Sequence, residues 1–379
     1  MAGGERLYRG AHMTEQELQA YIQAITPADR AAMDAAEKRQ AELAKPPGSL
    51  GELETISVRL AGITGQVCPA MDKCRVAVFA ADNGVVDEGV SCAPRSVTRQ
   101  QAVNMTRHVT GMSSLAACFG DQVAVVDVGM EQNPHCDAIL DRHIRRTTGN
   151  IAREDAMTRQ QALDALAAGM EQAALARRDG VTALGVGEMG IGNTTTSAAV
   201  LAVLTGADID TVTGRGGGLT DEGFARKKAV LRRAVTRRAI DRRDVLDVLT
   251  AVGGLDLAAM TGAFLGCAHE RIPAAADGFI SVVAALCAVR LCPAAADYIF
   301  LSHDSYEPGY RMAARELGMT PCLHLGMRLG EGSGCPLLFR VLEGACGVMR
   351  GMATFAEAAI QDDYLEEIRA VDAFTVEGA

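Results

Sequence analysis

A single carboxylate enclosed by glycines is the side chain of this sequence best suited to proton transfer. Glu331 lies between Gly330 and Gly332, and the apolar residues Leu329 and Met327 stand two and four positions before it. Glycine neighbours leave space for a substrate, and apolar neighbours can desolvate the carboxyl, which raises its pKa toward the range of a general base. The same residues also fit a plain loop carboxylate near the start of a helix, and the sequence alone leaves both interpretations open.

A glycine-rich stretch elsewhere has the composition of an anion-binding loop. It reads GEMGIGNTTT at residues 187–196, follows an apolar run and opens an alanine-rich segment. Glycines let the backbone approach a ligand, while helix N-terminal N–H groups and threonine hydroxyls suit an anion such as a phosphate. The stretch lacks the lysine of a Walker loop and the full dinucleotide fingerprint. A tight turn capped by threonines fits it equally well.

A second glycine-rich stretch reads TGRGGGL at residues 213–219. Such a run costs conformational entropy unless the backbone must adopt unusual dihedrals or crowd a ligand. Arg215, or Lys227 in the helix that we expect to follow, could supply a cation to a phosphate. For most of the other basic residues of that helix, we expect a solvated helix face.

Two further polar segments, residues 82–91 and 301–310, each follow an apolar run. The second segment contains Ser302, His303 and Asp304, the three residue types of a hydrolase triad. Three adjacent residues rarely form such a triad, and the sequence contains no G-x-S-x-G elbow. We therefore interpret this segment as a polar binding loop.

The apolar runs that precede these polar segments predict the strands that must position them. They are nearly continuous in apolar residues and alternate with segments of helical period, a pattern typical of a parallel sheet covered on both faces. Ligands of such sheets bind beyond the carboxyl ends of the strands, where the polar segments are expected. The expected fold is α/β, a parallel Rossmann-like sheet flanked by helices. The expected strands are residues 75–81, 122–129, 182–187, 278–281 and 297–302.

The two ends of the chain have a helical pattern and are expected to pack together as a smaller helical domain. Thr14 is a candidate cap for a first helix, Asp29 for a second, and a further helix is expected over residues 336–367. The expected division is an N-terminal helical segment (1–62), an α/β substrate-binding domain (63–335) and a C-terminal helical segment (336–379).

Composition excludes several classes of function. The 379 residues carry a formal net charge of −10, whereas a nucleic-acid partner requires a basic face. The N-terminus lacks the apolar core of a signal peptide, and charges or glycines interrupt the apolar runs before membrane-spanning length. The 11 cysteines and 7 histidines lack the spacing of zinc ligands, which indicates reduced thiols and no metal site. We therefore expect a cytoplasmic protein without nucleic-acid or membrane partners.

Taken together and in this order, these segments resemble the nicotinate-nucleotide:dimethylbenzimidazole phosphoribosyltransferase family of cobamide lower-ligand biosynthesis. Each piece is short, but the ordered set is specific and covers nearly the whole chain after about residue 13. The matching segments are KPPGSLG (45–51), ADNG (81–84), EGVS (88–91), GEMGIGNTT (187–195), GRG (214–216), AMTGA (259–263), DGFIS (277–281), SH (302–303), EPG (307–309) and LGEGSG (329–334).

The resemblance implies an enzyme that transfers phosphoribose from nicotinate mononucleotide to a benzimidazole nitrogen, releasing nicotinate and giving an α-linked ribotide, α-ribazole 5′-phosphate. Glu331 matches the family's catalytic base, which takes the proton of the incoming azole nitrogen. The residues that match the phosphoribosyl and phosphate site are Glu188, Gly190, Ile191, Gly192, Asn193, Thr194, Gly216, Gly218 and Lys227. Those that match the pocket for the aromatic base are Asn83, Ser91, Gln100, Met189 and Leu329.

The chemistry of this reaction agrees with the residues present. Attack at the anomeric carbon opposite a departing pyridinium needs positioning and one base, whereas no metal and no acid is required. We therefore expect no cofactor, and expect nicotinate mononucleotide and a benzimidazole-type base as small-molecule partners. Family members are homodimers, and the resemblance implies the same here.

The chain departs from the family pattern at a few positions. Asn83 and Tyr310 stand where the family more often has His, Asp256 where Glu is usual, and Gly217 where Thr is often found. Because Asn83 and Met189 lie near the implied acceptor pocket, a purine or a phenol acceptor stays open beside dimethylbenzimidazole. A non-catalytic paralogue that binds a nucleotide or cobamide precursor also stays open, as does a kinase or dehydrogenase of the same fold class.

Overall fold

The framework of the fold is a six-stranded sheet in a computed structural model that describes residues 12–366 of the chain. The strand order is β3-β2-β1-β4-β5-β6, and every neighbouring pair is parallel. The strands are β1 (Cys74–Ala81), β2 (Gln122–Gly129), β3 (Ile139–Asp141), β4 (Ala183–Met189), β5 (Ala274–Ala276) and β6 (Ile299–Leu301). The expected fold class is confirmed.

Helices occupy most of the connections between these strands. The α-helices of the described residues are α1 (Glu15–Gln23), α2 (Arg30–Glu42), α3 (Glu52–Thr64), α4 (Ser96–Thr106), α5 (Gly111–Phe119), α6 (Arg159–Arg178), α7 (Asn193–Thr205), α8 (Ile209–Val212), α9 (Asp221–Thr236), α10 (Val245–Val252), α11 (Leu255–Glu270), α12 (Phe279–Leu291), α13 (Pro308–Leu317) and α14 (Cys335–Gly351). Short 3-10 helices are η1 (Gly84–Glu88), η2 (Pro293–Tyr298) and η3 (Asp363–Leu365). None of the described helices is both long and apolar enough to span a membrane.

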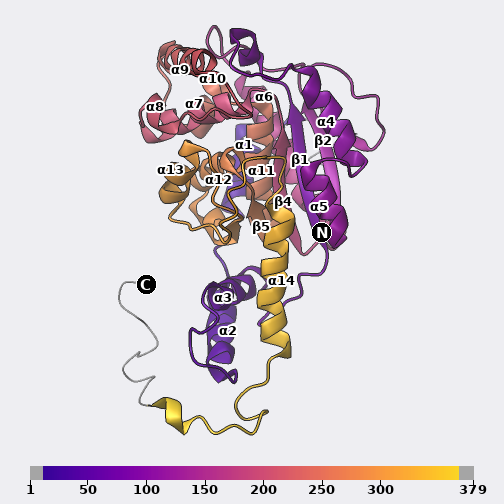
Figure 1. Ribbon diagram of the computed structural model, residues 1–379, viewed down its shortest axis with the longest axis vertical. Helices are drawn as coiled ribbons and strands as arrows, with labels where there is room; N and C mark the ends of the chain where they lie inside the picture. The colour runs from indigo at the N-terminus through magenta and orange to yellow at the C-terminus, as the bar shows by residue number, and fades with distance from the viewer. Residues whose placement is uncertain (1–11, 367–379) are drawn as a thin grey trace. The chain divides into compact units, whose positions relative to one another are not determined.

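The sheet carries helices on both faces (Figure 1). α4 and α5 lie along one side of β1 and β2, whereas α11 lies on the other side, between the strands and α6. α11 is buried from Leu255 to Ala268. Its close approach to α6 requires glycine, because a Cβ on Gly262 would lie 1.9 Å from the Leu166 carbonyl oxygen.

The strand order opens a crevice at one place. β1 pairs with both β2 and β4, but the chain runs from β1 to β2 and β3 before it returns to β4. The connections after β1 and β4 therefore leave on opposite sides of the sheet, and this divergence creates a binding crevice beyond the carboxyl ends of these two strands. The polar segments after β1 and β4 meet there.

The chain divides into two compact units, residues 12–26 with 73–338, and residues 27–72 with 339–366. The first contains the sheet, and the second contains α2, α3 and most of α14. The apolar core of the second unit includes Ala36, Leu43, Ala61 and Met349. The expected small domain also included residues 13–26, but α1 packs on α11 in the first unit.

One expected strand, residues 278–281, is wrong. These residues begin the helix α12, and the strand β5 lies just before them in three alanines. Alanine has little preference for strands, so this run does not stand out in the sequence, but its small side chains fit the fully buried place between β4 and β6. The Ser281 hydroxyl fixes the turn into the helix, since it accepts from the Asp277 N–H and donates to the Val186 carbonyl.

The expected helix over residues 336–367 is too long at its C-terminal end. α14 ends at Gly351, and the chain then pairs with the end of α2, where the Phe355 N–H donates to the Glu42 carbonyl. Residue 367 itself lies outside the described residues. The expected caps Thr14 and Asp29 are confirmed, because both side chains accept a backbone N–H of the helix that follows.

We predict that Gly262→Ala lowers the free energy of unfolding by about 1–3 kcal/mol, because the added methyl forces α11 away from α6. Calorimetric or denaturant unfolding measures the effect. Gly344→Ala in α14 is the matched control, since a Cβ there meets no atom within 4 Å. The control should be neutral or slightly stabilising, and equal losses in the two variants would contradict the packing argument.

Candidate active site

A cavity of about 280 Å³ lies beyond the carboxyl ends of the central strands. Its walls come from the segments that follow β1, β4, β5 and β6, together with the glycine loop before α9 and the loop before α14. All of these segments belong to the first unit. The lining residues include Ser91, Gln101, Glu188, Met189, Gly190, Ile191, Gly192, Asn193, Thr194, Gly216, Gly218, Asp277, His303, Ser305, Glu307, Arg328, Leu329 and Glu331.

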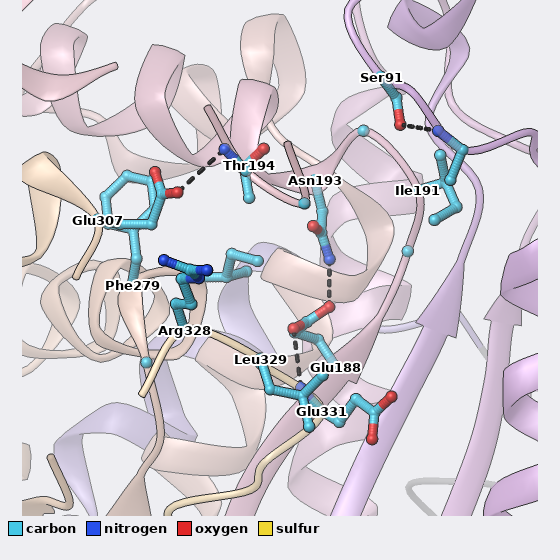
Figure 2. Close-up of a pocket in the computed structure, with 18 of the residues that line it drawn as sticks. Ser91, Glu188, Ile191, Asn193, Thr194, Phe279, Glu307, Arg328, Leu329 and Glu331 are labelled. Atoms are coloured by element: carbon cyan, nitrogen blue, oxygen red, sulfur yellow. Dashed lines mark hydrogen bonds between the residues drawn. The ribbon is translucent and has the colours of Figure 1, made fainter. Parts of the chain in front are cut away.

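Glu331 is held in a backbone conformation that residues with a side chain rarely adopt. Its φ is 65°, between Gly330 at 83° and Gly332 at 87°. A left-handed non-glycine residue costs on the order of 1–3 kcal/mol and persists only where its surroundings enforce it. Part of the enforcement is visible in Figure 2, where the Glu331 N–H donates to Glu188 Oε1 at 3.3 Å.

Glu331 is 6% exposed, and its carboxylate has polar partners at the N-terminal end of α5 and on α4. Oε2 accepts the Met112 N–H at 3.3 Å, and Oε1 accepts the Gln101 side-chain amide at 3.3 Å. Burial raises the pKa of Glu331, and the Met112 N–H opposes this rise. A carboxylate with a raised pKa binds a proton more strongly, which is the property that a general base needs.

A second carboxyl, Glu188, lies beside Glu331 in a network of hydrogen bonds to amides. The Asn193 side-chain amide donates to Glu188 Oε2 (Figure 2). The same amide donates to Asp256 Oδ2 at 3.2 Å. Burial and the charge of Asp256 raise the pKa of Glu188 to about 8, and burial raises the pKa of Asp256 to about 6. Glu188 is therefore largely protonated at neutral pH and can donate a hydrogen bond.

The opposite wall of the cavity has the features of an anion cradle. The turn from Gly190 to Thr194 leads into α7, and Gly192 at its N-cap has φ 93°. Lys227 lies behind this turn, where its Nζ donates to Thr194 Oγ1 at 2.9 Å and to the Gly214 carbonyl at 3.0 Å. Because the Thr194 oxygen accepts from lysine, its own proton is available to an anion in the cavity.

Lys227 and Glu307 set the charge of this wall. Burial lowers the pKa of Lys227 to about 8, and the charge of Glu307 opposes the shift. Glu307 Oε1 accepts the Gly216 N–H at 3.0 Å, whereas its buried Oε2 has no hydrogen-bond partner among the described residues. That oxygen can accept a hydrogen bond from a ligand hydroxyl, such as one on a sugar.

Apolar side chains also line the cavity, among them Val97, Met189 and Leu329, and Ser91 lines it as well. Leu329 lies close to Glu331, since a Cβ on Gly111 would meet both side chains within 4 Å. An apolar surface of this kind suits a planar heteroaromatic ring. The cavity thus combines features that suit an anion, a ligand hydroxyl and a planar ring beside a buried carboxylate.

Comparison with known proteins agrees with this combination. A family model described as Phosphoribosyltransferase matches residues 25–360. The chain belongs to this family.

Relatives of this phosphoribosyltransferase carry a more specific name. A nicotinate-nucleotide–dimethylbenzimidazole phosphoribosyltransferase of Clostridium perfringens strain 13 is 46% identical over 90% of this chain and 94% of the relative. The protein of that name from Acetivibrio thermocellus is 44% identical over 87% of this chain and 94% of the relative. A crystal structure of CobT from Thermus thermophilus superposes with a TM-score of 0.84 at 39% identity, covering 88% of this chain and 99% of that one. The resemblance seen in the sequence is confirmed.

Most residues that the sequence singled out in this phosphoribosyltransferase line the cavity, with three exceptions. Lys227 and Asn83 are buried behind the turn that starts at Gly190, and Asn83 Nδ2 contacts the Ile191 carbonyl at 3.5 Å. Gln100 is exposed on α4 and does not line the cavity. Its neighbour Gln101 takes that place, because α4 turns only one of two adjacent side chains toward Glu331.

Sequence reasoning did not assign site roles to Gln101, Asp277, Glu307 or Arg328, which all line the cavity. Glu307 and Asp277 stand in matched family segments, and both follow a strand of the sheet. That position beyond the carboxyl end of a strand was the available signal. For Gln101 and Arg328 no comparable signal exists in the sequence.

We predict that Glu188→Gln changes the dependence of stability on pH. The wild-type carboxyl has a pKa of about 8 when folded, against its ordinary value of 4.5 when unfolded, so folding favours the protonated form. The free energy of unfolding of the wild type should fall as pH rises between these values, by a few kcal/mol at most. Glutamine does not ionise, so the free energy of unfolding of the variant should rise relative to that of the wild type as pH increases across this window. Parallel curves in urea unfolding from pH 4.5 to 9 would contradict the raised pKa.

Proposed function

We propose that the protein transfers phosphoribose from nicotinate mononucleotide to 5,6-dimethylbenzimidazole or a related lower-ligand base. The products are nicotinate and α-ribazole 5′-phosphate. The observation that carries this proposal is the position of Glu331, a buried carboxylate that faces the same cavity as the anion cradle. The names of the relatives supply the identity of the two substrates.

The donor nucleotide fits the cradle side of the cavity. Its phosphate would bind the turn from Gly190 to Thr194 and the glycine loop at Gly216 and Gly218, with Lys227 behind them. The ribose hydroxyls would then lie between the glutamates of the cavity, where a protonated carboxyl donates and an ionised one accepts.

The acceptor fits the apolar wall formed by Met189 and Leu329, with Ser91 at the edge and Gln101 beside the base. Asn83 lies behind this wall and would shape the acceptor site indirectly. In the bound complex the acceptor N–H points at Glu331, and the opposite ring nitrogen points at the anomeric carbon. This arrangement holds both reactants for an in-line displacement.

The reaction balances with Glu331 as the only acid–base group. The acceptor nitrogen forms a bond to the anomeric carbon, while the bond from that carbon to the pyridinium nitrogen breaks and its electron pair neutralises the leaving nicotinate ring. Glu331 takes the proton from the other acceptor nitrogen, so the product azole is neutral. A single displacement inverts the anomeric carbon, which accounts for an α-linked product from a β-linked donor.

We predict that Glu331→Ala lowers the rate of ribotide formation by about 10²–10⁴-fold, the usual contribution of a general base. The assay mixes nicotinate mononucleotide with dimethylbenzimidazole, other benzimidazoles, adenine or phenols, and identifies the ribotides by mass. Glu131→Ala is the control, since Glu131 follows the strand β2 and does not line this cavity. Full activity of Glu331→Ala would remove the base from this role. Binding of the nucleotide without nicotinate release, under every acceptor, would identify a non-catalytic paralogue instead.

We further propose a cytoplasmic homodimer, as the family resemblance implies. Sedimentation equilibrium of the full chain should then give twice the mass of the 39.8 kDa chain over the micromolar range. A single species at the mass of one chain would contradict the dimer.

A further inference from the structure

Asp277 holds the backbone that follows the base. It comes directly after β5 and is 2% exposed. Its Oδ2 accepts the Gly332 N–H at 3.0 Å, and its Oδ1 accepts the Gly334 N–H at 2.6 Å. Both amides lie within three residues of Glu331, so one buried carboxylate fixes the chain immediately after the base.

The backbone at this point needs such a restraint. Three consecutive residues, from Gly330 to Gly332, have φ between 65° and 87°, and only Glu331 among them carries a side chain. The strand β4 packs closely against the same segment, since a Cβ on Gly187 would lie 2.6 Å from the Glu331 carbonyl oxygen. A segment in this conformation relaxes when its hydrogen bonds are lost, and the Glu331 carboxylate would move with it.

We propose that Asp277 is a positioning residue for the base, which keeps the Glu331 side chain in the cavity by holding the two amides that follow it. The proposal rests on the role of Glu331 in the proposed function. Asp277 need not touch a substrate for this purpose. It acts through the backbone, whereas Gln101 and the Met112 N–H act on the carboxylate itself.

The charge of Asp277 gives the proposal a second readout. This charge raises the pKa of Glu331, so its removal should lower that pKa. The His303 imidazole lies beside Asp277, with Nδ1 3.7 Å from Oδ1, and the Ser302 hydroxyl lies 2.9 Å from the same Nδ1. The charge of Asp277 also raises the pKa of Glu188, Tyr310 and Cys335.

The fold contains a close structural match for Asp277 outside the cavity. Asp127, near the end of β2, is 5% exposed, and its Oδ1 alone accepts both the Gly129 and the Met130 N–H groups, each at 2.9 Å. His143 lies 3.3 Å from its carboxylate. Asp127 is therefore also a buried aspartate with two backbone amides and an imidazole as neighbours, at a place away from Glu331.

The experiment compares Asp277→Asn with Asp127→Asn in the full-length protein. Each variant keeps one acceptor oxygen and loses one. Because Asp277 uses one oxygen for each of its two amides, Asp277→Asn should lose one of these hydrogen bonds and some stability in urea unfolding, whereas Asp127→Asn can keep both amides on its remaining oxygen and should lose less. Asp277→Asn alone should lower kcat by about 100-fold, the effect of moving a catalytic group by about 1 Å, with KM for nicotinate mononucleotide within roughly threefold. Its acid limb in the kcat–pH profile should move to lower pH, because the pKa of Glu331 falls.

Two results would overturn the proposal: a kcat for Asp277→Asn within roughly threefold of that of Asp127→Asn, or a lower kcat with an unmoved acid limb. If Asp277→Asn does not fold, Ser302→Ala replaces it, since the Ser302 hydroxyl donates to the Asp277 carbonyl and does not line the cavity. A lower kcat at unchanged KM then supports the proposal, and an unchanged kcat overturns it. An active Glu331→Ala would instead contradict the proposed function itself.

Discussion

The structure depends on the burial of several carboxyl groups at one edge of a parallel sheet, with amides rather than cations as their main partners. Removing an ionised carboxylate from water is costly unless polar groups replace the lost solvent. Here the replacements are backbone N–H groups and side-chain amides. Asp256 accepts an N–H in the first turn of α11, Glu331 accepts one at the start of α5, and Asn193 bridges Glu188 and Asp256.

This choice of partners has a chemical effect that arginine would not have. A guanidinium beside a carboxylate lowers its pKa and makes it a poor base. Amides compensate for desolvation only in part, so Glu331 and Glu188 keep a raised pKa. Under the proposed function, a site that must take a proton from a weakly acidic ring can be built in this way. The buried Lys227 donates to Thr194 and Gly214 and is not paired with Glu331.

The same constraint accounts for the distribution of glycine. Amide donors reach buried carboxylates only when backbone segments approach one another closely, and a side chain would prevent it. A Cβ on Gly190 would lie 2.6 Å from Asp256 Oδ2, and one on Gly334 would lie 2.4 Å from His303 Nδ1. Glycines that suggest flexible loops in the sequence are therefore tightly packed parts of the site.

The sequence predicts the sheet and the main site segments because both leave local signals. Apolar runs such as residues 75–81 identify buried strands, and glycines near Glu331 identify a crowded loop. The sequence does not predict β5, because three alanines have no strand pattern, and it places Gln100 in the cavity where Gln101 lies. These errors concern which neighbour faces the site, and that depends on helix rotation and packing rather than on local residue type.

The carboxyl network also has a consequence for how the protein binds an anionic nucleotide. Glu188, Asp256 and Lys227 have pKa values of about 8, 6 and 8, which all lie within about two units of neutral pH. A phosphate in the anion cradle favours the protonated form of Lys227 most, because this lysine lies directly behind the turn from Gly190 to Thr194. Association is therefore accompanied by uptake of protons from the buffer, so that the measured heat of binding includes the ionisation heat of that buffer.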